Sequence, residues 1–162
     1  TLSKVKGLLG LKDEITSKKK GSSSSYLDSK NGLYKIRYTY AVGSRKPSKT
    51  KRDFCRNMMN MANAGIVWTI EDIDRASREG VNRELGHNRQ SYDLFKFKGG
   101  IYCRHKWKKV LYRLESNTEP SENLGNYKKT KTIPKSYMKN PSGSKQAGIA
   151  PENMPNRGAY PI

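Results

Sequence analysis

The chain has 162 residues, of which 33% are hydrophobic, and 33 Lys and Arg against 14 Asp and Glu give a formal charge of +19. So few apolar side chains exclude a compact core built from the whole length, and no apolar run is long enough to cross a bilayer. The first residues also lack the apolar stretch of a signal peptide. Because such an excess of positive charge repels itself, we expect a partner that neutralises it, nucleic acid first and an acidic protein surface second.

Residues 1–32 have the composition of a basic arm. Gly21 and four serines follow three consecutive lysines, Lys18, Lys19 and Lys20, and such a segment gains too little from burial to order by itself. We expect the lysines to contact nucleic acid or an acidic surface. The chain starts at Thr1, for which removal of an initiator Met and release from a longer precursor are both open explanations.

The first elements of a folded unit, residues 33–115, follow the arm. Leu33 to Val42 alternate aromatic or aliphatic side chains with polar ones, which predicts a half-buried strand. A helix is expected over residues 54–64, with Asp53 as its N-terminal cap and Gly65 as its left-handed end.

A second helix is predicted over residues 70–79, because Thr69 and Asp72 have the spacing of a capping box. Residues 92–98 alternate again, and with a turn at Gly99 and Gly100 they predict a hairpin whose second strand covers residues 101–114. The predicted fold is therefore a small α+β domain of short antiparallel strands and two helices.

The last segment, residues 116–162, is rich in Pro and Gly and poor in aliphatic side chains. This composition predicts an extended C-terminal tail that is either disordered or laid over a neighbouring molecule. Its isolated apolar residues, such as Ile133 and Tyr137, are expected to act as anchors on a surface rather than as a core.

Two cysteines and two histidines all lie in the predicted folded segment. Strand alternation puts Cys103 and His105 on one face, about 6.5 Å apart at the backbone, a span that two side chains can close around one ion. Cys55 and His87 would complete a Cys2His2 set, the donors of a structural zinc site, whose binding energy would help so polar a segment to fold. The spacing is not that of a standard zinc finger, so the alternative stays open that the cysteines are core residues and the histidines surface groups.

A catalytic role for these residues is disfavoured. A Cys–His nucleophile needs an orienting group and a substrate pocket, and a metal nuclease needs carboxylate ligands or a His-rich cluster. Glu84 and Asp93 are the acidic residues near His87 in the sequence, and both serve equally well as surface partners of Arg83 and Arg89. We therefore predict that the chain is not an enzyme.

Basic side chains alternate with aromatic ones along the predicted strands. Residues 33–115 hold 19 Lys and Arg against 8 Asp and Glu, a difference of 11 charges, so the excess is not confined to the two tails. The aromatic residues either stack on a single strand of nucleic acid or form the core, and the period of two favours the core. Four basic residues of the last strand are expected to contact nucleic acid or an acidic surface: Arg104, Lys106, Lys108 and Lys109.

Several motifs in fixed order resemble a known module. The stretches "KIRYTYAV", "SRKPSKTKRDFCRNMM", "IVWTIEDIDRAS", "LGHN" and "YDLFKFKGGIYCRHKW" are similar to a C-terminal module of head-associated proteins in tailed bacteriophages, especially phages of Bacteroidetes hosts. The resemblance covers about residues 36–112. In that family a prohead-protease-like or head-morphogenesis region can precede the module, and this chain contains no such region.

The resemblance implies a virion structural protein of the capsid or portal vertex, present in the host cytoplasm during assembly. Its partners would be the major capsid or portal proteins in a large symmetric assembly, with packaged DNA as a further contact, and Thr1 would be a proteolytic terminus. It also implies that Cys55, Cys103 and His105 are motif residues, with His87 as the fourth metal ligand. The main alternative is a basic nucleic-acid-binding module of ribosomal-protein type.

Overall fold

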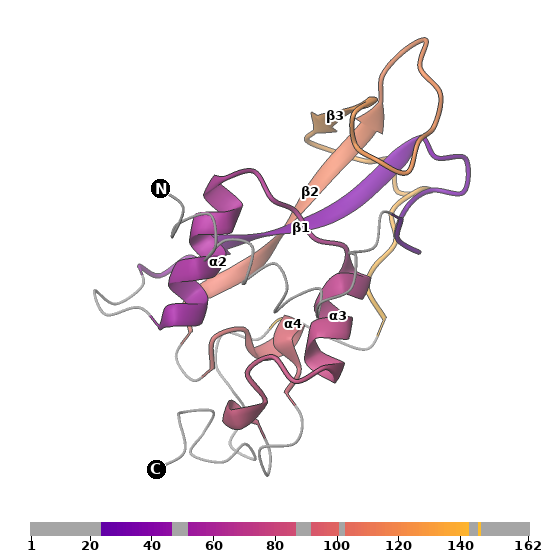
Figure 1. Ribbon diagram of the computed structural model, residues 1–162. Coiled ribbons are helices and arrows are strands. Elements are labelled where there is room, and N and C mark those ends of the chain that lie inside the picture. The colour runs from indigo at the N-terminus through magenta and orange to yellow at the C-terminus, as the bar shows by residue number, and fades with distance from the viewer. Residues whose placement is uncertain (1–23, 47–51, 87–91, 101–102, 143–145, 147–162) are drawn as a thin grey trace, which may run out of the picture.

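The computed structural model describes residues 24–46, 52–86, 92–100, 103–142 and 146. In these residues three strands and three α-helices form a small α+β fold, as predicted, with one α-helix more than expected (Figure 1). In chain order the elements are β1 (Tyr34–Val42), α2 (Asp53–Asn63), α3 (Ile70–Arg78), the 3-10 helix η1 (Arg83–Leu85), α4 (Leu94–Phe97), β2 (His105–Leu114) and β3 (Tyr127–Thr130).

The sheet is antiparallel with the order β1–β2–β3. β1 and β2 pair along their whole length, from Tyr34 opposite Arg113 to Val42 opposite His105, whereas β3 pairs with the last four residues of β2 only. Figure 1 shows the resulting long ribbon, with α2 beside one end and β3 at the other. The predicted first strand is present, with its alternate aromatic and aliphatic residues in the core, but the expectation of a half-buried strand is wrong for its first half, because Lys35 and Arg37 on the other face are buried as well.

Helix α2 buries the face that its sequence predicts, with Phe54, Met58 and Met61 in the core and Cys55 beside them. The chain leaves the helix through Gly65, at a φ of +87°, a left-handed conformation that glycine adopts without steric cost. The predicted cap is wrong, because Asp53 is the first helical residue and its carboxylate accepts from the side chain of Arg56.

Helix α3 begins with the predicted capping box. The Thr69 hydroxyl accepts from the backbone N–H of Asp72, and the Asp72 carboxylate accepts from the backbone N–H of Thr69. Both bonds satisfy donors that a helix start leaves unpaired. Trp68, just before the box, forms an isolated bridge with Tyr38 of β1 and so fixes the helix against the sheet.

The predicted strand over residues 92–98 is wrong, and so is the hairpin. Residues 94–97 form the short helix α4, because the Asp93 side chain accepts from the backbone N–H of Lys96 and the N–H of Leu94 donates to Ser77 of α3. Four alternating residues fit a helical turn as well as a strand. The last strand of the prediction is confirmed from His105 onwards, and it pairs with β1 and β3 instead.

Segments on both sides of the predicted folded unit pack onto the sheet. Leu27 and Ile133 are 1% and 6% exposed and belong to the hydrophobic core, so Ile133 is not a surface anchor. Tyr137 lies half-buried against the ring of Tyr34, 5.0 Å between centroids. No helix within the described ranges is long and apolar enough to span a membrane.

Candidate metal centre

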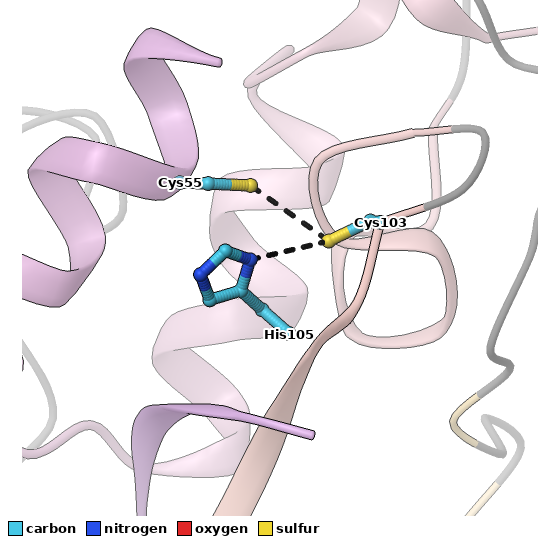
Figure 2. Close-up of side chains that lie close together, drawn as sticks. All are labelled: Cys55, Cys103 and His105. Atoms are coloured by element: carbon cyan, nitrogen blue, oxygen red, sulfur yellow. Dashed lines mark hydrogen bonds between the residues drawn. The ribbon is translucent and has the colours of Figure 1, made fainter. Parts of the chain in front are cut away.

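Cys55, Cys103 and His105 come together in the core (Figure 2). Cys55 lies in the first turn of α2, Cys103 two residues before β2, and His105 is the first residue of β2. All three side chains are buried, and one potential ligand atom of each lies within 4.8 Å of the others. The predicted juxtaposition of these three residues is therefore present.

The spacing of the ligand atoms fits a tetrahedral ion. The two Sγ atoms are 3.7 Å apart, and the Sγ of Cys103 is 3.9 Å from Nδ1 of His105. Two sulfurs that bind zinc at about 2.3 Å with a tetrahedral angle lie about 3.8 Å apart. A disulfide would need about 2.05 Å, and both cysteines are free thiols. Cys55, Cys103 and His105 are thus close enough, and of the right chemistry, to hold a metal ion.

Tyr40 of β1 connects the members of the cluster. Its hydroxyl lies 3.3 Å from the Sγ of Cys55 and 3.4 Å from that of Cys103. Its ring stacks on the His105 imidazole, with 5.1 Å between the ring centroids. The Trp107 ring lies edge-on to it, with 5.0 Å between the centroids. One side chain therefore contacts both sulfurs and also fixes the plane of the histidine.

The two thiols share their protons unequally. Hydrogen bonding with Cys55 lowers the pKa of Cys103, with further contributions from His105, Tyr40 and the backbone of Gly99, while burial opposes the shift. The same bond with Cys103, together with burial, raises the pKa of Cys55. The contacts around Cys103 thus favour its thiolate, the form of a cysteine that binds metal.

Gly99 allows the close approach of the chain to the cluster. A Cβ built on it would lie 2.3 Å from the Sγ of Cys55 and 3.5 Å from that of Cys103, so only glycine fits without a shift. The neighbouring Lys98 is 2% exposed, its Nζ donates to the carbonyl of Lys96 at 3.3 Å, and burial lowers the pKa of its ammonium. Electrostatic attraction to Cys103, and then to Cys55, raises that pKa in opposition.

One nitrogen of the His105 ring is buried and has no hydrogen-bond partner in the described part of the chain. This nitrogen is Nε2, whereas Nδ1 faces the Sγ of Cys103. The contact of Nδ1 with Cys103 and the stacking on Tyr40 therefore hold the ring in place, without a hydrogen bond at Nε2 in the described part of the chain.

The structure describes only some of the other predicted site residues. His87, the expected fourth ligand, and Lys18, Lys19 and Lys20 are outside the described residues. Arg104, Lys106 and Lys108 are exposed on the side of the strand that faces away from Cys103 and His105, and their contact with nucleic acid or an acidic surface stays a prediction. Lys109 lies on the opposite face of β2, half-buried, and its Nζ donates to the Asn140 side chain at 3.3 Å.

Sequence reasoning missed Tyr40 and Gly99 as members of the site. The alternation of β1 places Tyr40 on the buried face, but nothing in the sequence pairs it with a cysteine 15 or 63 residues away. The local pattern assigns Gly99 to a hairpin turn instead. No protein-family model matches the chain, and no curated protein or solved structure does so either.

Proposed function

We propose that this chain is a structural protein of a tailed-phage virion, located at the capsid or portal vertex, whose folded part is stabilised by zinc. The motif order over residues 36–112 supports the virion placement. Burial supports the structural role of the metal, because the three ligand atoms lie inside the core and are contacted by Tyr40 and Gly99 rather than by a substrate pocket. The chain is proposed to have no enzymatic activity.

The observation that carries the zinc proposal is the donor set. Two sulfurs and an imidazole at these separations suit zinc better than the hard cations, which prefer oxygen ligands. His87 would be the fourth ligand. A closed site of this kind supplies folding energy and leaves no position for a reacting water.

Zinc is tested by elemental analysis of protein purified without added metal. We expect about one zinc per chain, and a loss of bound zinc in the Cys55→Ser and Cys103→Ser variants. A Ser77→Ala variant, which removes a hydroxyl outside the cluster, is the control and should keep the metal. A zinc content near zero in the wild type would reject the proposal.

The virion placement is tested by quantitative mass spectrometry of purified phage particles. A structural protein should be present at a fixed copy number relative to the major capsid protein, in multiples set by the symmetry of its position, and should stay after the DNA has been released. Absence from particles, or an irregular copy number once the DNA is gone, would contradict it.

A second candidate is a basic nucleic-acid-binding module of ribosomal-protein type. The observation in its favour is that the three strands contain no acidic residue. This candidate predicts co-sedimentation with ribosomes at low salt and release at high salt, because phosphate contacts depend steeply on ionic strength. A virion protein would sediment with particles instead.

A further inference from the structure

Charge is segregated between the two layers of the domain. The strands carry eight Lys and Arg and no Asp or Glu, whereas α3 and its C-terminal cap carry four of the acidic residues. The basic residues of the strands are Lys35, Arg37, Lys106, Lys108, Lys109, Arg113, Lys128 and Lys129. Five of the eight, Lys35, Arg37, Lys106, Lys108 and Lys129, lie on the face of the sheet that points away from the core, and the other three lie on the core-facing side.

Three of the exposed basic side chains form a row. Arg104, Lys106 and Lys108 alternate with the buried Cys103, His105 and Trp107, so they point away from the core. Same-face residues of a strand are about 6.8 Å apart, which makes the row about 14 Å long. We call these three residues the basic row.

The strand beside the basic row leaves it accessible. Ala41 lies opposite Lys106, and Thr39 lies opposite Lys108. Both are small and half-exposed, so no large β1 side chain stands over the ammonium groups.

Two of the other cations on this face already have partners, and a third, Lys129 of β3, is exposed as the basic row is. Lys35 donates to the Ser121 carbonyl and Arg37 pairs with Asp28, and both are buried. The ammonium groups of Lys106 and Lys108 form no hydrogen bond or ion pair with another residue in the described ranges.

Arg104 is held in place while most of its donors stay available. One guanidinium N–H donates to the Lys46 carbonyl at 2.7 Å, and a guanidinium has five donors. The Arg104 carbonyl in turn accepts from the N–H of Gly43, so the loop after β1 is fixed beside the row.

The same face offers no aromatic platform for bases. Among the described residues, the exposed large hydrophobic side chains are Tyr26 and Val42. Val42 lies opposite His105, on the other face of the ribbon, and the Tyr26 hydroxyl accepts from the N–H of Ser142. Stacking on aromatic rings is how single strands are commonly bound, so the chemistry here is that of phosphate contacts alone.

We propose that Arg104, Lys106 and Lys108 bind the phosphate backbone of duplex nucleic acid without reading its base sequence. This surface does not depend on the virion placement or on zinc chemistry. If the chain were absent from phage particles, the proposal of duplex binding would not be affected. If duplex binding were absent, the proposal of a virion protein would not be affected.

The test measures binding of the purified full chain to two 20-bp DNA duplexes of unrelated sequence by fluorescence anisotropy over a range of salt concentrations. Binding weakens as salt rises, so the slope of log K against log[salt] is negative. Each lost phosphate contact should reduce the magnitude of this slope by about 1. We therefore expect the magnitude of the slope to be about 3 smaller in the R104Q/K106Q/K108Q variant, equally for both duplexes.

The matched control removes the same three charges elsewhere. Arg56, Arg78 and Arg83 are exposed on or beside the helices, and the R56Q/R78Q/R83Q variant should keep most of the slope. Thermal unfolding of both variants confirms that they fold. An unchanged slope in the first variant, an equal loss in the control, or preferred binding of polyglutamate over the duplex at equal charge concentration would overturn the proposal.

Discussion

The two ends of the β1–β2 ribbon are held by different chemistry. At the end where Val42 pairs with His105, no third strand extends the sheet in the described residues, and the buried Cys55, Cys103 and His105 cluster joins the ribbon to α2. At the other end β3 extends the sheet and segments from both sides of the chain close over it. We call these the cluster end and the β3 end.

Polar contacts dominate the β3 end. The buried Arg37 pairs with Asp28 at 2.6 Å, and Lys139 donates to the carbonyls of Tyr26 and Asp28. The Tyr127 hydroxyl donates to the Gly32 carbonyl at 2.6 Å. The bonds of Lys139 and Tyr127 join residues 24–32 to residues 127–139, about 100 positions away in sequence.

The difference shows that a chain with few apolar residues can stabilise the two ends of one ribbon by different interactions. The β3 end uses hydrogen bonds and an ion pair that form near neutral pH, whereas the cluster end brings together groups that would bind the proposed metal in their deprotonated form. Stability should therefore respond locally, one end to metal and the other to loss of charged partners.

The largest effect is expected from metal removal. Structural zinc contributes about 10–16 kcal/mol of apparent binding energy in small zinc-finger peptides, and we expect a loss of several kcal/mol here. A domain of this size should then lose more than about 10 °C in Tm. Hydrogen exchange should show that α2 and residues 105–107 lose protection on chelation while residues 111–114 keep it. Equal loss at both ends would contradict the comparison.

The next effect concerns the β3 end. Asp28→Ala removes the carboxylate that pairs with the buried Arg37, and breaking a buried pair in this way costs about 3–5 kcal/mol. Adding Arg37→Met should recover part of that loss, measured by urea unfolding. The exposed pair of Asp53 and Arg56 is the control, since Asp53→Ala should change stability by less than about 1 kcal/mol. Neither variant should alter metal content.

The elements with strong local signals could be predicted from the sequence. Strand alternation over residues 34–42 and the capping box of Thr69 and Asp72 depend on neighbours a few positions apart, and both are present. For the same reason the proximity of Cys103 to His105 could be predicted, because the two residues are two positions apart in the sequence. The prediction that Cys103 contacts Cys55 came from the presence of only two cysteines in the chain, and no local pattern supported it.

Features set by distant contacts could not be predicted. Residues 94–97 form a helix because Leu94 bonds to Ser77 of α3, which no local pattern records. Leu27 and Ile133 enter the core although their segments look like linkers, because a core needs only a few apolar side chains from each. The Tyr40 hydroxyl meets the sulfurs only through the pairing of β1 with β2.

A smaller effect should follow from Gly99→Ala. The added Cβ would lie 2.3 Å from the Sγ of Cys55, so the sulfurs or the backbone must shift, at about 1–3 kcal/mol. We expect weaker zinc binding in a chelator competition as well as lower stability. Gly125→Ala is the control, because its Cβ would approach the Asn123 side chain at 3.1 Å and nothing in the cluster. Identical zinc affinity in both variants would show that the close approach of Gly99 does not shape the cluster.

The smallest effect, and the most specific one, is expected from Tyr40→Phe. The substitution removes the hydroxyl that contacts both sulfurs and keeps the ring that stacks on His105. Removal of such an outer partner typically lowers metal affinity about 10- to 100-fold. Tyr38→Phe is a close control, because the buried Tyr38 hydroxyl has no hydrogen-bond partner among the described residues and its removal should be neutral or stabilising. If competition with a chelator gives both variants the wild-type affinity, the hydroxyl of Tyr40 packs beside the cluster end without stabilising its bound form.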